Sequence, residues 1–266
     1  MSKSKIEMLI IDPQNDFCSD KGSLFVAGAD KDSILLAKTI KRLKTRLDDI
    51  HVTLDTHHYI DIAHPVFWVD SKGNNPNPFT LITANDVRNG IWRTKNPGYM
   101  KRAIDYVETL EKNNRYVLCI WPPHCLIGTW GHNVVDPVMD ALFEWEREFA
   151  MVDYVTKGSN FWTEHYSAVQ ADVPDSQDPG TMLNTRLIQT LQEADVIALS
   201  GQALSHCVAN TIRDIANNFG EDNIKKLVLL IDTTSPVTGF ESLGQDFLNE
   251  MIARGMQTCN AADFMK

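Results

Sequence analysis

Short apolar runs alternate with longer amphipathic segments along most of the chain. The apolar runs are rich in Val, Ile and Leu, as buried β-strands are, and they lie at residues 7–11, 52–54, 116–120, 151–155, 196–199 and 227–231. Between them, apolar residues recur at spacings of three and four, which predicts helices at residues 30–47, 98–112, 137–149, 184–193, 208–217 and 241–254. This alternation predicts an α/β fold with a six-stranded, mostly parallel sheet and helices on both faces, a Rossmann-like three-layer arrangement.

Two irregular stretches interrupt this rhythm. Residues 66–97 are rich in Asn, Pro and Gly, and residues 170–181 are rich in Asp and Pro. Because strands and helices resume directly after each stretch, we expect both to be long loops of a single domain spanning residues 1–266. Ligands of parallel sheets bind beyond the carboxyl ends of the strands. The polar residues that follow each strand are therefore the candidates for chemistry.

Composition and charge narrow the classes of partner. Of the 266 residues, 43% are hydrophobic and 23% are charged, as in a globular protein. The formal net charge of −10 disfavours a nucleic acid or an anionic membrane as partner. The apolar run at residues 8–11 is too short for a signal-peptide core or a membrane span. Five irregularly spaced cysteines without a CxxC pair predict no disulfide framework and a cytoplasmic location.

Histidines and an aspartate follow the second and third predicted strands. Asp55 and His57 are two residues apart at the end of the second strand, so they face the same side. His64 follows seven residues later, and His124 comes after the third strand, whose end we expect beside the second. Carboxylate and imidazole ligands predict a divalent metal, with Zn²⁺ favoured and Fe²⁺ or Mn²⁺ as alternatives. The remaining histidines are interpreted as surface-loop residues: His51, His58, His132 and His165.

Three other strand ends carry Asp12, Lys157 and Cys207. Asp12 suits either a turn cap or a catalytic acid, and no GxGxxG run follows it, which excludes a dinucleotide site of the Rossmann type. Lys157 has a functional role only if an anion lies beside it. Cys207 is predicted at a helix N-terminus, where the dipole lowers the pKa of a thiol. The set suits a cysteine hydrolase with an aspartate as base. The other cysteines are interpreted as small core residues: Cys18, Cys119, Cys125 and Cys259.

Five stretches, in order, resemble the nicotinamidases (pyrazinamidases) of the isochorismatase-like cysteine hydrolase superfamily. They are LIIDPQNDFC with GSLFVAGA after it, LDTHH, WPPHCLIGTWG, VTKGSN and SGQALSHCVANTIRD. These stretches span residues 9 to about 214. The WPPHC stretch distinguishes metal-containing members, and the turn from GxA into Cys207 marks the superfamily as a whole.

The resemblance implies a role for each matching residue. The implied catalytic residues are Asp12, Lys157 and the nucleophile Cys207. The N–H groups of Ala203, which follows a bond that is cis in the family, and of Cys207 form the implied oxyanion hole. The implied metal ligands are Asp55, His57 and His124, with His64 near an additional metal-associated histidine of some members. An aromatic slot for a flat ring is implied for Phe17, Trp121 and Tyr166, although core packing explains each of them equally well.

The implied activity is hydrolysis of nicotinamide to nicotinate and ammonia through a cysteine thioester, a step of NAD salvage. Compared with compact bacterial members, residues 66–113 look like an insertion, which we expect to form a lid, reshape the pocket or build a homo-oligomer contact. Residues 161–165 also look longer and bulkier than usual. Both departures keep open a metal-containing amidase for another small amide or carbamoyl compound. A non-catalytic ligand-binding relative is a further alternative, and vinyl-ether hydrolysis of the isochorismate type ranks last.

Overall fold

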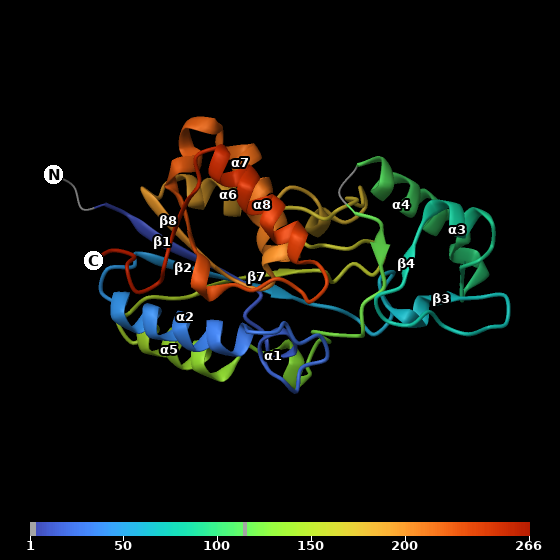
Figure 1. Ribbon diagram of the computed structural model, residues 1–266, viewed down its shortest axis with the longest axis horizontal. Coiled ribbons are helices and arrows are strands. Elements are labelled where there is room, and N and C mark those ends of the chain that lie inside the picture. The colour runs from blue at the N-terminus through green and yellow to red at the C-terminus, as the bar shows by residue number, and fades with distance from the viewer. Residues whose placement is uncertain (1–3, 114–115) are drawn as a thin grey trace.

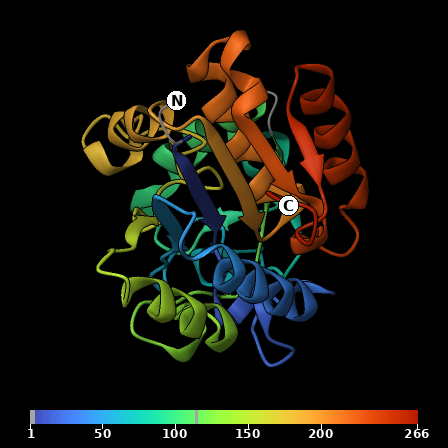
Figure 2. The same cartoon turned by 90° about the vertical axis from the view of Figure 1, so that its left-hand side faces the viewer.

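The computed structural model describes residues 4–113 and 116–266, and its centre is a six-stranded sheet (Figures 1 and 2). In spatial order, the strands are β10 (Gln257–Cys259), β9 (Leu227–Leu230), β8 (Val196–Gly201), β1 (Ile6–Ile11), β2 (Asp49–Asp55) and β7 (Asp153–Lys157). Every neighbouring pair is parallel. All six residues of β1 are buried, as a strand covered on both faces requires. The predicted α/β class is confirmed.

Helices cover both faces of this sheet. One face packs against α2 (Ala29–Leu43) and α5 (Asp136–Glu146), and the other against α6 (Thr185–Gln192), α7 (Ala209–Phe219) and α8 (Glu241–Ala253) (Figure 2). Alternate residues of β1 divide between the two cores: Met8 and Ile10 face α2, whereas Leu9 and Ile11 face α7. No helix among the described residues is long and apolar enough to cross a lipid bilayer.

The segment between β2 and α5 lies beside the sheet, at the right of Figure 1. It contains β3 (Trp68–Val69), β4 (Leu81–Ile82), α3 (Ala84–Arg88), β5 (Arg93–Thr94), α4 (Met100–Lys112) and β6 (Leu118–Cys119). Two antiparallel pairs, β3 with β5 and β4 with β6, hold it together. That residues 66–113 are an insertion stays a prediction.

Short elements complete the fold. The four-residue helix α1 (Asn15–Cys18) follows β1, and a π-helical turn at Leu204–Val208 precedes α7. Single 3₁₀ segments lie at Pro65–Phe67, Pro97–Tyr99, Trp130–His132, Pro179–Thr181, Glu221–Lys226 and Ile231–Thr233.

One predicted strand of the main sheet is wrong. Only Leu118 and Cys119 of the run at 116–120 form a strand, and it pairs with β4 instead of joining the parallel sheet. Leu118, Cys119 and Ile120 are buried in a hydrophobic core cluster, which explains why this part of the run is apolar, whereas Val117 is exposed. The sixth strand is β10, an edge strand of Gln, Thr and Cys whose side chains are largely exposed, so no apolar pattern reveals it.

Candidate active site

Asp12 stands where β1 ends, in the centre of the sheet. Its φ of 46° turns the chain sharply out of the strand, and its side chain is fully buried. The carboxylate accepts a hydrogen bond from the Thr53 hydroxyl of β2, with 2.5 Å between Oγ1 and Oδ1. Strand β1 therefore places the Asp12 carboxylate at the carboxyl end of the sheet, with Oδ1 held by the Thr53 hydroxyl.

Lys157 lies between the other two predicted catalytic residues, Asp12 and Cys207. It ends β7 directly opposite Asp55 of β2. Its Nζ lies 2.9 Å from Asp12 Oδ2, 3.0 Å from Asp55 Oδ1 and 3.7 Å from the Sγ of Cys207. Burial disfavours the ammonium, but the two carboxylates hold the pKa of Lys157 well above its usual value. The structure thus brings Asp12, Lys157 and Cys207 into one buried cluster.

Cys207 lies in the π-helical turn after β8, and the turn is shaped by the residues before it. Gly201 has a φ of 115°, and a Cβ on it would lie 2.0 Å from the Ile11 carbonyl oxygen, so the backbone passes where no side chain fits. The Gln202–Ala203 peptide bond is cis, as the resemblance implies. The chain then doubles back and aims the Cys207 side chain at Lys157.

Cys207 lies at the N-terminal end of a helical segment, as predicted, but the predicted lowering of its thiol pKa is wrong. α7 begins at Ala209, two residues after Cys207. Burial raises the pKa of the Cys207 thiol well above its usual value, and the Lys157 ammonium only partly opposes this. Burial therefore favours the protonated thiol, and a base beside it is needed to form the thiolate.

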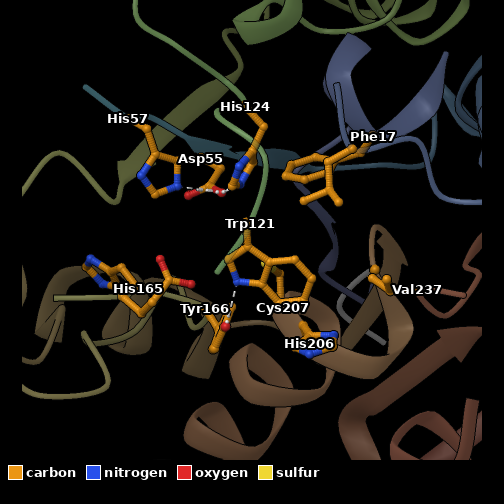
Figure 3. A pocket seen from close by; sticks show the side chains of 13 residues that line it. Phe17, Asp55, His57, Trp121, His124, His165, Tyr166, His206, Cys207 and Val237 are labelled. Carbon is orange, nitrogen blue, oxygen red and sulfur yellow. Dashed lines mark hydrogen bonds and ion pairs between the residues drawn. The ribbon is translucent and has the colours of Figure 1, made fainter. Parts of the chain in front are cut away.

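The three predicted metal ligands meet at one point. His57 Nε2 lies 3.1 Å and His124 Nε2 lies 3.3 Å from Asp55 Oδ2, and Figure 3 shows the two imidazoles on either side of this carboxylate. The His64 ring packs against both, with centroids 5.3 Å from His57 and 5.5 Å from His124. All four side chains are buried.

Outer contacts orient every imidazole of this cluster. The Nδ1 atoms of His57, His64 and His124 face three fixed acceptors, which are the Asp61 carboxylate at 3.1 Å, the Tyr59 carbonyl at 3.2 Å and the Pro122 carbonyl at 2.9 Å. When Nδ1–H is donated outward, Nε2 points inward, where a cation can take the place of its proton. The Nε2 of His64 is buried without a hydrogen-bond partner among the described residues.

These donors fit a divalent cation. Three imidazole nitrogens and one carboxylate oxygen are the ligand types of zinc sites. Although burial opposes it, the carboxylates of Asp55 and Asp61 hold the pKa of His57 well above its usual value. A cation bound here would therefore displace a proton from His57, and binding should strengthen as pH rises.

His124 reaches the cluster by a route that the sequence did not predict. It lies in the loop after β6, outside the main sheet, so it is not at a neighbouring strand end. Two contacts of the next residue fix this loop, because the Cys125 N–H donates to Asp16 Oδ2 at 2.6 Å and its carbonyl accepts from the His57 N–H at 3.0 Å. His124 is therefore positioned by loop contacts and not, as we expected, by the pairing of neighbouring strands.

A pocket opens onto the Cys207 thiol and the predicted metal ligands. The predicted ring-binding residues Phe17, Trp121 and Tyr166 all line it, and Trp121 Nε1 donates to the Tyr166 hydroxyl at 2.9 Å (Figure 3). The other lining residues are Leu24, Asp55, His57, His124, Glu164, His165, Ala203, His206, Cys207 and Val237. The wall is mostly aromatic and aliphatic, with the thiol exposed to one side of the space and the metal-ligand set to another, which suits a small flat molecule.

Several site residues escaped the sequence analysis. His165, predicted on a surface loop, is buried and lines the cavity. His51, also predicted on a surface loop, is buried on β2 between Glu7 and Asp153 and is not part of the cavity lining. Glu164 also lines it, and burial together with the nearby Asp61 raises the pKa of this carboxyl to about 8. Asp61, which orients His57, carries one signal in the sequence, its place four residues after that histidine.

Replacing Gly158 by alanine tests how tightly the two clusters are joined. A Cβ at this position would lie 2.8 Å from Asp55 Oδ1 and 3.3 Å from the His57 ring, and Gly158 has a φ of 84°. We expect the variant to bind Zn²⁺ about tenfold or more weakly, because the displaced side chains are ligands. Competition with a chromogenic chelator measures this, with Gly73→Ala, at an open position, as the control. Unchanged affinity in Gly158→Ala would contradict the geometry.

Comparisons with known proteins agree with this picture. No protein-family model matches the chain. The curated nicotinamidase of Saccharomyces cerevisiae is 27% identical over 234 residues, 87% of this chain and 88% of the relative. The crystal structure of the yeast nicotinamidase bound to the inhibitor nicotinaldehyde has a TM-score of 0.64 at 20% identity, with 96% and 99% of the two chains covered. Pyrazinamidase of Pyrococcus horikoshii in complex with zinc gives a TM-score of 0.58 at 19% identity, with 96% and 99% covered.

The chain therefore shares the α/β fold of these nicotinamidase and pyrazinamidase structures, with the candidate residues gathered at the carboxyl end of the sheet. Its resemblance to the nicotinamidases in particular, predicted from the motifs, is confirmed by these comparisons.

Proposed function

We propose that this protein is a cysteine amidohydrolase that converts nicotinamide and water to nicotinate and ammonia. The observation that carries the proposal is the meeting of Lys157 with Asp12, Asp55 and Cys207 at 2.9–3.7 Å, at the wall of an aromatic cavity. The nicotinamidase relative and the nicotinaldehyde bound to the yeast enzyme support the same substrate class.

In the first half-reaction, Asp12 takes the proton of Cys207, and the sulfur attacks the carboxamide carbon. Lys157, between the two groups, balances the negative charge as it moves from oxygen to sulfur. The N–H groups of Ala203 and Cys207 hold the oxyanion, and losing one such donor typically costs about 10²–10³ in rate. Asp12 then gives the proton to the amide nitrogen, the C–N bond breaks, and ammonia leaves a thioester.

In the second half-reaction, water attacks the thioester carbon. Asp12, again a carboxylate, takes a proton from this water, the C–S bond breaks, and the sulfur recovers the proton as the acid leaves. One aspartate thus serves as base and acid in turn, which requires a buried site where the proton is not lost to solvent.

Asp55, His57 and His124 would hold a divalent cation, with His64 beside them, and Zn²⁺ is favoured by the ligand set and by the zinc-bound pyrazinamidase. Bound there, such a cation supplies a coordination position for a ring nitrogen and so orients the ring. Phe17, Trp121 and Tyr166 would clamp the ring faces and edge. We also place the enzyme in the cytoplasm, since all five cysteines are free and the nucleophile has to stay reduced.

Ammonia release from purified protein tests this function. We expect release from nicotinamide and pyrazinamide, and rates at least about 100-fold lower from a linear amide and an N-carbamoyl amino acid, which the aromatic slot does not orient. Equal rates on the linear compounds would favour the alternative amidase, and no hydrolysis of any amide would overturn the proposal.

Removing the metal is expected to slow nicotinamide hydrolysis by at least about tenfold, because the ring loses one of its anchors. Dialysis against a chelator, followed by kinetics with and without added Zn²⁺, measures this. Full activity of protein shown to be metal-free would contradict the role assigned to the histidine cluster. Recovery on adding Zn²⁺ is the control for damage by the chelator.

A further inference from the structure

The Thr53 hydroxyl makes two hydrogen bonds, and both are with Asp12. Thr53 is fully buried on β2, beside the end of β1. Its Oγ1 accepts a hydrogen bond from the Asp12 backbone N–H at 3.0 Å and lies 2.5 Å from Asp12 Oδ1. Sequence analysis did not single out this threonine, which sits two residues before a predicted metal ligand.

Counting donors fixes the direction of these hydrogen bonds. A hydroxyl has one hydrogen, and the backbone N–H of Asp12 already points at the Thr53 oxygen. The hydroxyl hydrogen therefore points to Oδ1 of Asp12. That oxygen already accepts one hydrogen bond, from the β2 side of the carboxylate.

The other oxygen of Asp12 has a different environment. Oδ2 is buried and pairs with the Lys157 Nζ at 2.9 Å. Lys157 also lies 3.7 Å from the Cys207 sulfur, so Oδ2 faces the side of the carboxylate where the thiol lies. The two oxygens of the carboxylate thus have different partners, the Thr53 hydroxyl for Oδ1 and the Lys157 ammonium for Oδ2.

We propose that Thr53 is a positioning residue that makes Oδ2 of Asp12 the one oxygen that carries the catalytic proton. The S–H bond of Cys207 breaks and an O–H bond forms on Oδ2, while Oδ1 keeps its bond from Thr53. The same proton then passes from Oδ2 to the amide nitrogen as the C–N bond breaks. This rests on the proposed function, because the proton path is that of the amidohydrolase.

Two matched pairs of variants test the hydroxyl separately from packing. Thr53→Val keeps the shape of threonine without its hydroxyl, while Thr53→Ser keeps the hydroxyl, and Thr53→Ala differs from the serine variant by that oxygen alone. We expect kcat for nicotinamide to fall about 10- to 100-fold in the valine and alanine variants, with KM within about twofold of the original. The serine variant should stay within about threefold of the wild type.

A second readout does not depend on amide hydrolysis. Alkylation of Cys207 by iodoacetamide, located by mass spectrometry, requires only that the thiol lose its proton. We expect it to slow in parallel with kcat in Thr53→Val and Thr53→Ala and to recover in Thr53→Ser. Thr39→Val, at a buried threonine of α2 whose hydroxyl bonds to the Leu35 carbonyl, is the control and should change neither rate.

The outcomes separate this inference from the proposed function. Wild-type kcat and alkylation in Thr53→Val would overturn the inference, and so would a Thr53→Ser variant as impaired as Thr53→Ala, since packing would then be the cause. If Thr53→Val does not fold, the serine and alanine pair decides. Wild-type protein that hydrolyses no amide would refute the function, whereas the alkylation series would still report on Asp12.

Discussion

Replacement of Cys207 by alanine is expected to lower nicotinamide hydrolysis by about 10⁴-fold or more, to the level of the uncatalysed reaction with bound substrate. Enzymes that lose their nucleophile show losses of this size, because the remaining groups have nothing to activate. Here the loss should be nearly complete, since Asp12 and Lys157 both act on that sulfur. Steady-state ammonia release measures the effect.

The matched control is Cys119→Ala, which removes a buried thiol that does not line the cavity. It should keep kcat within about threefold of the wild type. A Cys207→Ala variant that retains its rate would end the proposed mechanism. Binding of nicotinamide to Cys207→Ala should persist, because the aromatic slot and the histidine cluster are untouched.

Replacement of Asp12 by asparagine is expected to lower kcat by about 10²–10⁴-fold, the range typical of a general acid–base group. Burial holds the pKa of the Cys207 thiol high, so without a carboxylate beside it the thiol keeps its proton. The asparagine also leaves Lys157 with Asp55 as its remaining anionic partner. Kinetics should therefore be accompanied by a thermal unfolding curve, so that loss of chemistry is separated from loss of fold.

Asp20→Asn, at an exposed aspartate shortly after α1, is the control and should leave kcat unchanged. If Asp12→Asn folds and keeps more than about a tenth of the wild-type kcat, another base acts on Cys207. The negligible rate that we predict would instead agree with one buried aspartate serving in both half-reactions.

Much of the sheet and the catalytic set could be predicted because the signals are local. A buried parallel strand needs a run of apolar residues, so β1 and β8 stand out, and the polar residues after them mark its carboxyl end. Asp12, Lys157 and Cys207 come from three strand ends that a parallel sheet gathers at one edge. The distances of 2.9–3.7 Å between them depend on the order of the strands in the sheet. The alternation of strands and helices predicts a parallel sheet but does not determine this order.

What the sequence did not reveal depends on non-local contacts. His124 reaches the metal ligands through a loop tied to Asp16, and no residue pattern encodes that hydrogen bond. The low hydrophobicity of β10 hides an edge strand. The high pKa of Cys207 arises from burial by distant segments, so an argument from the helix dipole alone gave the wrong direction.

Positioning residues were the hardest to find. Asp61 and Thr53 touch a histidine and an aspartate, not a substrate, and their residue types are common on any surface loop or strand. Only the three-dimensional structure shows that both hydrogen bonds of the Thr53 hydroxyl are made with Asp12, and that the Asp61 carboxylate contacts His57 as well as the Ala63 N–H. Residues that act through others carry almost no signal in a single sequence.

The central claim, that one sulfur made reactive by Asp12 and Lys157 carries the acyl group, can be tested by trapping the intermediate. Wild-type protein mixed with nicotinamide, quenched in acid within the first turnovers and digested, should show a nicotinoyl group on the peptide that contains Cys207. The same adduct should be missing from Cys207→Ala. The account would be contradicted if the enzyme turned over rapidly with the acyl group on another residue. It would also be contradicted if no acylated peptide were found under conditions that trap a synthetic thioester.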